Sequence, residues 1–245
     1  MLCNLCSFLL AGVLLCSSIF CWAQIPDTDA WTNQIIATAA NPTPAKVNGQ
    51  LTEITFNNPD LIWTTINNQP YLKVVSFKSE SSAQYYKNDK DGFYNTGTRD
   101  TWVSIAPQVQ EYCKTIERDK MNITNRLEAY LGLQPNAGYA IWIEMWVQPK
   151  DLFRPCPDAE ITDNTCELCL PEGVSAEHRQ WFNELRAVQY TGAGSNGYSG
   201  WPWTQLGYTY DWWPGSRTVG ASEFIIRQGS EVVVIDKTPT NEYCE

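Results

Sequence analysis

The amino-acid sequence predicts an α+β fold, in which one compact domain holds a mixed, mainly antiparallel sheet, flanking helices and long disulfide-stapled loops. Of the 245 residues, 43% are hydrophobic and 18% charged, a composition typical of a chain with one sizeable core. Aromatic and β-branched runs at 71–78 and 140–147 have the length of strands, whereas apolar residues recur at helical spacing through 109–131. Glycine, proline and cysteine interrupt residues 150–218, which indicates long loops.

The N-terminal segment indicates export. Residues 1–23 contain no charged side chain and end in Cys21 and Ala23, a pattern typical of a cleaved signal peptide. The alternative is a retained membrane anchor, because the apolar run 8–22 approaches the roughly 20 residues that a membrane span needs. The length and the small residues at the end favour cleavage. We therefore predict a secreted, extracellular protein that has no membrane attachment after cleavage.

The mature chain divides into an arm and a domain. Residues 24–59 are rich in Asn, Thr, Pro and Ala and form an N-terminal arm, with a short helix at 29–39 and a strand at 50–56. Residues 60–245 form a single globular α+β domain.

The elements of that domain follow from local signals. Pro107 suits the first turn of a helix and Gly132 suits its end, so one long or two shorter helices lie between them. Gly138 and Pro149 bound a largely buried strand, and Gln228-Gly229-Ser230 separates the two halves of a hairpin or bent strand pair. The expected strands are 71–78, 100–105, 140–147, 222–227 and 231–236, and a further helix is expected at 177–188.

Signal cleavage would leave five of the nine cysteines. Five thiols allow two disulfides and one free cysteine, and the sequence leaves their connectivity open. A zinc site built from Cys156, Cys166, Cys169 and His178 is the alternative interpretation, but oxidation competes with thiolate ligation outside the cell. We therefore expect disulfides and no metal.

Charge and histidine content exclude several functional classes. The chain carries 17 Lys and Arg against 27 Asp and Glu, a net charge of −10 that disfavours binding to nucleic acid or to anionic membranes. The single histidine excludes zinc sites that need two or three imidazoles. No serine lies in a GxSxG elbow, so a hydrolase triad of that type is not expected.

Large aromatic side chains are concentrated in residues 201–213. Exposed Trp and Tyr rings stack well on sugars, so one hypothesis is a non-enzymatic secreted protein that binds a carbohydrate through this aromatic loop, or an effector. Most of these rings should nevertheless belong to the core, because a fully exposed cluster of this size would aggregate.

Several short segments together resemble secreted ADP-ribosyltransferase toxins of the cholera and pertussis type. They are Val75-Ser76-Phe77-Lys78, Asp91-Gly92-Phe93-Tyr94, Thr101-Trp102-Val103-Ser104-Ile105, Gly138-Tyr139-Ala140-Ile141-Trp142-Ile143 and Ser222-Glu223-Phe224-Ile225-Ile226. The resemblance implies a toxin or effector, a glycosyltransferase that uses NAD as its substrate. ADP-ribose would be transferred to an unidentified acceptor or released to water.

The resemblance also implies roles for individual residues. Glu223 would stabilise the oxocarbenium character that develops when the nicotinamide–ribose bond breaks, and Ser104 would orient that carboxylate or the ribose. Lys78 stands where the family has arginine and would neutralise phosphate, while Phe93 or Tyr94 would pack on nicotinamide.

Two alternatives concern the acidic residue. A second alignment places the acidic motif of the family at Asp158-Ala159-Glu160, which makes Glu160 the rival catalytic carboxylate. The second alternative gives Glu223 no catalytic role. It is then a strand carboxylate that faces water, since an alternating strand exposes every second residue.

Overall fold

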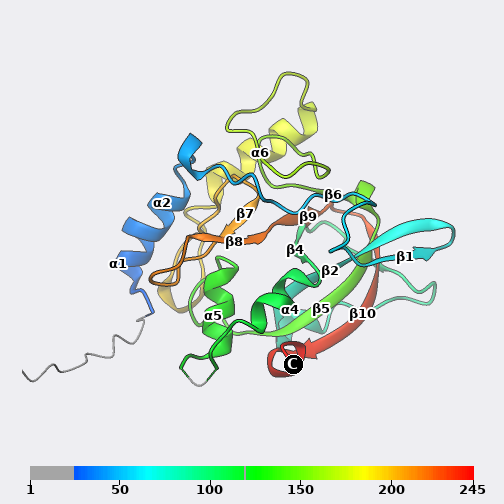
Figure 1. The fold of residues 1–245 in the computed structure, drawn as a ribbon, viewed down its shortest axis with the longest axis horizontal. Helices are drawn as coiled ribbons and strands as arrows, with labels where there is room; N and C mark the ends of the chain where they lie inside the picture. The colour runs from blue at the N-terminus through cyan, green and yellow to red at the C-terminus, as the bar shows by residue number, and fades with distance from the viewer. Residues whose placement is uncertain (1–24, 119) are drawn as a thin grey trace, which may run out of the picture.

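The computed structural model describes residues 25–118 and 120–245 and confirms the α+β prediction (Figure 1). The signal peptide expected at 1–23 lies outside the described residues. An eight-stranded sheet runs in the order β3-β10-β5-β2-β4-β9-β6, with β1 paired to β2, and β7 and β8 form a separate two-stranded sheet. All the pairings between these strands are antiparallel.

The long strands agree with the sequence pattern. β2 and β5 correspond to the two buried runs, and β9 and β10 to the halves of the C-terminal pair. The strands are β1 (Trp63–Ile66), β2 (Gln69–Ser79), β3 (Tyr94–Asn95), β4 (Thr101–Ile105), β5 (Tyr139–Val147), β6 (Leu152–Phe153), β7 (Tyr208–Tyr210), β8 (Val219–Ser222), β9 (Phe224–Ile226) and β10 (Glu231–Pro239).

The helices are short and flank the sheet. The helical region after Pro107 is two helices, α4 and α5, and α6 matches the helix expected at 177–188. The α-helices are α1 (Thr28–Ala30), α2 (Ala37–Ala39), α3 (Glu80–Ala83), α4 (Gln108–Cys113), α5 (Ile123–Tyr130), α6 (Ala176–Val188) and α7 (Thr240–Tyr243). A π-helical turn, η1 (Trp31–Ile36), joins α1 to α2, and the 3₁₀ turns are η2 (Pro44–Lys46), η3 (Pro149–Asp151) and η4 (Ser195–Gly197).

Each face of the large sheet carries its own apolar core. Leu72, Val74 and Met145 pack on one face, while Val75 and Phe77 pack on the other against α4, α5 and α7. The alternation along β2 follows from the two-residue period of a strand. The second face matters for function, because it continues into an apolar cavity lined by Val75, Phe77 and Trp142.

The strand predicted at 50–56 is wrong. This segment is extended, but its backbone makes separate hydrogen bonds and no ladder. Leu51 N–H donates to Asn164 O, Ile54 N–H donates to Ile161 O, and Thr52 N–H donates to the Ser222 hydroxyl. It therefore belongs to no sheet. The helix expected at 29–39 is present as the run from α1 to α2.

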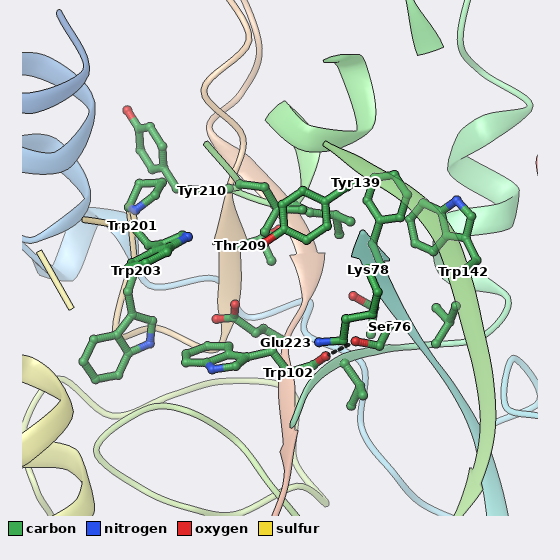
Figure 2. A pocket seen from close by; sticks show the side chains of 18 of the residues that line it. Ser76, Lys78, Trp102, Tyr139, Trp142, Trp201, Trp203, Thr209, Tyr210 and Glu223 are labelled. Carbon is green, nitrogen blue, oxygen red and sulfur yellow. Dashed lines mark hydrogen bonds between the residues drawn. The ribbon is translucent and has the colours of Figure 1, made fainter. Parts of the chain in front are cut away.

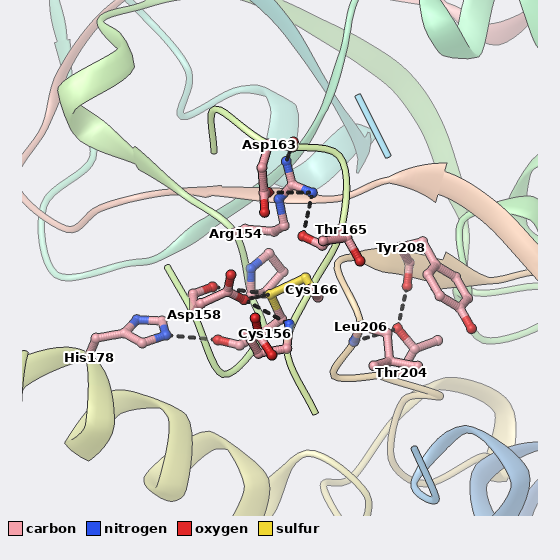
Figure 3. Close-up of a disulfide and its surroundings, with 12 residues drawn as sticks. Arg154, Cys156, Asp158, Asp163, Thr165, Cys166, His178, Thr204, Leu206 and Tyr208 are labelled. Atoms are coloured by element: carbon pink, nitrogen blue, oxygen red, sulfur yellow. Dashed lines mark hydrogen bonds and ion pairs between the residues drawn. A yellow bond between two sulfur atoms is a disulfide. The ribbon is translucent and has the colours of Figure 1, made fainter. Parts of the chain in front are cut away.

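Two disulfides join Cys113 to Cys244 and Cys156 to Cys166, and Cys169 is free and exposed. The loop closed by the Cys156–Cys166 disulfide is organised around Arg154. The buried guanidinium of Arg154 donates hydrogen bonds to the carbonyls of Thr52, Asp163 and Thr165 (Figure 3). The disulfide loop is thus fastened to the arm and to itself.

Within the described residues, none of the helices has the length and apolar character needed to cross a bilayer.

Candidate functional site

A cavity of about 340 Å³ opens between the large sheet, the loop after α5 and the aromatic segment 201–210 (Figure 2). Its walls are mainly apolar and aromatic. Only two of its lining residues carry an ionisable acid or amine, Glu223 and Lys78. A largely apolar cavity with a few convergent polar groups is the usual form of a small-molecule site.

The cavity lies where the pairing of two neighbouring strands, β2 and β4, ends. β2 and β4 pair only at Val74 with Ile105 and at Val75 with Ser104. Beyond this point β2 continues alongside β5, and the Ser76 hydroxyl donates a 2.7 Å hydrogen bond to the carbonyl of Trp102. The resulting gap in the sheet leaves space for side chains and for a ligand.

Glu223 is the single residue between β8 and β9, at the point where the chain passes from the small sheet to the large one. Its backbone N–H donates a 2.9 Å hydrogen bond to the carbonyl of Gly207. The side chain points into the cavity (Figure 2), and its Oε2 is buried with no hydrogen-bond partner among the described residues. Burial raises the pKa of Glu223 to about 8. A carboxylate that simply faces water does not fit this environment.

Gly207 allows this arrangement. Its φ of +73° is unfavourable for other residues, and a Cβ at this position would lie 2.6 Å from the Sγ of Cys166. The backbone that holds Glu223 therefore packs directly against the Cys156–Cys166 disulfide.

Lys78 reaches the cavity from β2, next to an irregularity in the β2–β5 register. Its Nζ lies 5.8 Å from the ring centroid of Tyr86, and it forms no ion pair with any carboxylate in the described part of the chain. Lys73 on the same strand differs, because its amine lies 2.6 Å from a carboxylate oxygen of Glu144. Burial lowers the pKa of Lys78 to about 8.

Ser104 lies on β4, which is placed between β2, the strand of Lys78, and β9, the strand that directly follows Glu223. It is paired with Val75 on one side, and the pairing of Val103 with Phe224 on the other side puts Ser104 next to Glu223 in the register. Ser104 is buried and lines the cavity. Lys78, Ser104 and Glu223, which are far apart in the sequence, are therefore brought to one cavity.

Aromatic rings form much of the remaining wall. Trp142 stacks on Phe77 with centroids 4.1 Å apart, and Tyr243 stacks on the other face of this indole at 4.6 Å. Trp102, Tyr139, Trp201 and Tyr210 also line the cavity (Figure 2). Trp201 and Tyr210 belong to the segment 201–213 that was predicted to bind carbohydrate. Trp102, Tyr139 and Trp142 were not among the predicted site residues, although the alternation of β4 puts Trp102 on the same face as Ser104.

The aromatic segment 201–213 is largely internal. Trp203, Tyr208 and Trp212 are buried. The indole N–H of Trp203 donates to the carbonyl of Pro155 at 3.0 Å, and that of Trp212 donates to Leu133 at 2.8 Å. This burial argues against an exposed platform for sugars.

The other candidate residues lie outside the cavity. Glu160 is exposed in the disulfide loop, where its carboxylate accepts a hydrogen bond from Thr162. Tyr94 lies on β3, at the far edge of the sheet, and packs on Tyr86 with centroids 5.0 Å apart. Phe93, its neighbour, does not line the cavity either. The strand order, which the local sequence does not encode, separates both rings from Glu223.

His178, the single histidine, is buried outside the cavity, and its Nε2 lies 2.8 Å from the carbonyl oxygen of Cys156. It therefore supports the disulfide loop.

Comparison with protein-family models, with curated proteins and with solved structures finds no match to this chain.

Proposed function

We propose that the protein is a secreted enzyme of the ADP-ribosyltransferase type, which cleaves the nicotinamide–ribose bond of NAD in this cavity. The ADP-ribose is passed to an acceptor nucleophile or to water. The observation that carries the proposal is Glu223, a carboxyl group whose Oε2 is buried and unpartnered in an aromatic cavity. An unpartnered acid is costly to bury, so its presence in a cavity indicates a role with a ligand.

The chemistry needs a fixed negative charge near the ribose. In the proposed step the bond between ribose C1′ and the pyridinium nitrogen breaks, and its electron pair goes to the nitrogen of the departing neutral nicotinamide. The ribose gains oxocarbenium character, which the Glu223 carboxylate stabilises. Water or the acceptor then forms the new bond to C1′ and loses a proton.

The remaining groups fit supporting roles. Ser104, adjacent to Glu223 in the strand register, is placed to orient the carboxylate or a ribose hydroxyl. The aromatic walls suit a flat, positively charged ring, since cations are attracted to the faces of Trp and Tyr.

Proton release accompanies binding in this proposal. Because the pKa of Glu223 is raised to about 8, the carboxyl of the empty cavity is mostly protonated at pH 7. A bound pyridinium favours the charged form and lowers this pKa, so substrate binding produces the carboxylate that the reaction uses.

The test follows nicotinamide release from NAD by the purified protein. Wild-type protein should release nicotinamide, and Glu223→Gln, which keeps size but removes the charge, should reduce the rate about 10²-fold or more. The matched control is Glu160→Gln, which removes an exposed carboxylate outside the cavity and should leave the rate unchanged. A Glu223→Gln rate equal to wild type would refute the proposal, and loss of activity in the Glu160 variant alone would support the rival alignment.

Secretion is part of the same proposal. Its support is the apolar, uncharged segment 1–23 together with the two disulfides, which persist in oxidising compartments. N-terminal sequencing of the protein from the culture medium should begin at Gln24.

A further inference from the structure

The size and charge of the cavity specify which part of NAD it would hold. A volume of about 340 Å³ lies near the lower end of the roughly 300–1,000 Å³ range of small-molecule sites. A dinucleotide is a long molecule with two nucleoside units, two phosphates and two bases. The cavity is more suited to one nucleotide than to two.

The ionisable groups of the cavity also suit a single nucleotide. Lys78 is the only cationic residue that lines the cavity, and Glu223 is the only acidic one. Both side chains point into the cavity in Figure 2. One carboxylate and one ammonium complement a ligand with one cationic ring and one phosphate. They provide no second cation for a second phosphate.

We propose that the cavity recognises only the nicotinamide mononucleotide half of its substrate, so that free nicotinamide mononucleotide is cleaved as well as NAD. This inference rests on the proposed function and specifies its substrate class. Glu223 faces the pyridinium and ribose C1′, and Lys78 binds the 5′-phosphate. The adenosine half of NAD stays outside the cavity.

The lack of an ion-pair partner for Lys78 among the described residues supports its proposed role in binding phosphate. The amine of Lys73 is neutralised by Glu144, whereas that of Lys78 has no ion-pair partner among the described residues. A half-buried ammonium without a counter-ion among the described residues favours an anionic ligand, because the ligand supplies the missing charge. Hydrolysis of the mononucleotide balances as nicotinamide mononucleotide plus water giving nicotinamide, ribose 5-phosphate and a proton.

The experiment compares three substrates: NAD, nicotinamide mononucleotide and nicotinamide riboside, which lacks the phosphate. Wild-type protein should cleave the mononucleotide with a kcat/KM within about tenfold of that for NAD. Lys78→Met should lower kcat/KM for both phosphate-bearing substrates by about 10- to 100-fold, mainly through KM, and leave the riboside unchanged. Lys87→Met, which removes an exposed positive charge, is the matched control and should change none of the three.

Each unfavourable result has a distinct meaning. Cleavage of NAD without cleavage of the mononucleotide overturns this inference and leaves the proposed function intact. An equal loss with all three substrates in Lys78→Met overturns the phosphate role and indicates a structural one. If no substrate releases nicotinamide, the proposed function fails as well. Calorimetric titration gives a second readout, in which nicotinamide mononucleotide should bind and adenosine monophosphate should not, and tight binding of the adenosine nucleotide would also overturn the inference.

Discussion

Replacing Glu223 by glutamine should change how the stability of the folded protein depends on pH. The pKa of Glu223 is raised from its ordinary value of 4.5 to about 8, so the folded state binds this proton more tightly than the unfolded state. The resulting stabilisation is complete below about pH 4.5 and is lost as the pH rises to about 8. The glutamine variant has no proton to lose at this position.

The size of the effect follows from the shift. A pKa change of this size sets an upper limit of about 5 kcal/mol in the free energy of unfolding, and because Glu223 is only half-buried we expect about 2–5 kcal/mol. We therefore compare the free energy of unfolding of Glu223→Gln with that of wild type at each pH. Between pH 4.5 and pH 8.5 this difference should shift by about 2–5 kcal/mol in favour of the variant.

Urea unfolding of both proteins at several pH values between 4.5 and 8.5 measures this difference. The absolute stability of the variant also contains the cost of burying an amide, but that cost does not depend on pH. The exposed Glu160→Gln variant shows how much removal of a surface charge contributes. A difference between wild type and Glu223→Gln that stays constant within about 1 kcal/mol over this range would show that the carboxyl is not desolvated.

Three further variants test the framework of the site. Trp203→Ala should lower the free energy of unfolding by about 3–5 kcal/mol in urea, because it leaves a void beside the cavity, whereas a loss of glycan binding without loss of stability would favour the carbohydrate hypothesis. Gly207→Ala should destabilise the protein by about 1–3 kcal/mol through its positive φ and contact with the disulfide, and a wild-type melting temperature would contradict that geometry. Cys113→Ser should cost about 2–5 kcal/mol in the same assay, and an unchanged midpoint would show that the Cys113–Cys244 bridge does not constrain the chain.

Local patterning predicted much of the sheet but little of its arrangement. The long apolar runs identified β2 and β5 because strand length and residue type are encoded locally. The order of strands depends on tertiary packing, and for that reason the placement of Tyr94 at the far edge was not predictable. The segment 50–56 has a strand-like composition, yet it is paired with an irregular loop and forms no sheet.

The candidate site was predictable in part. The resemblance selected Lys78, Ser104 and Glu223, which line one cavity, and this convergence depends on contacts that the sequence does not show. The cavity itself arises where β2 and β4 separate, and no residue pattern signals that separation. The abundance of aromatic residues in 201–213 was evident, but their division between core and cavity wall required the three-dimensional packing.

The contact between Gly207 and the Cys156–Cys166 bridge links the position of an acid to the oxidation state of two sulfurs. The bridge backs the glycine, and the glycine carbonyl anchors the backbone of Glu223. In a newly made chain whose thiols are still reduced, no covalent bond holds the Cys166 sulfur against Gly207. The Glu223 carboxylate should therefore reach its final position only after the Cys156–Cys166 disulfide has formed. Maturation of the site would then coincide with the oxidation of two cysteines that are ten residues apart in the chain.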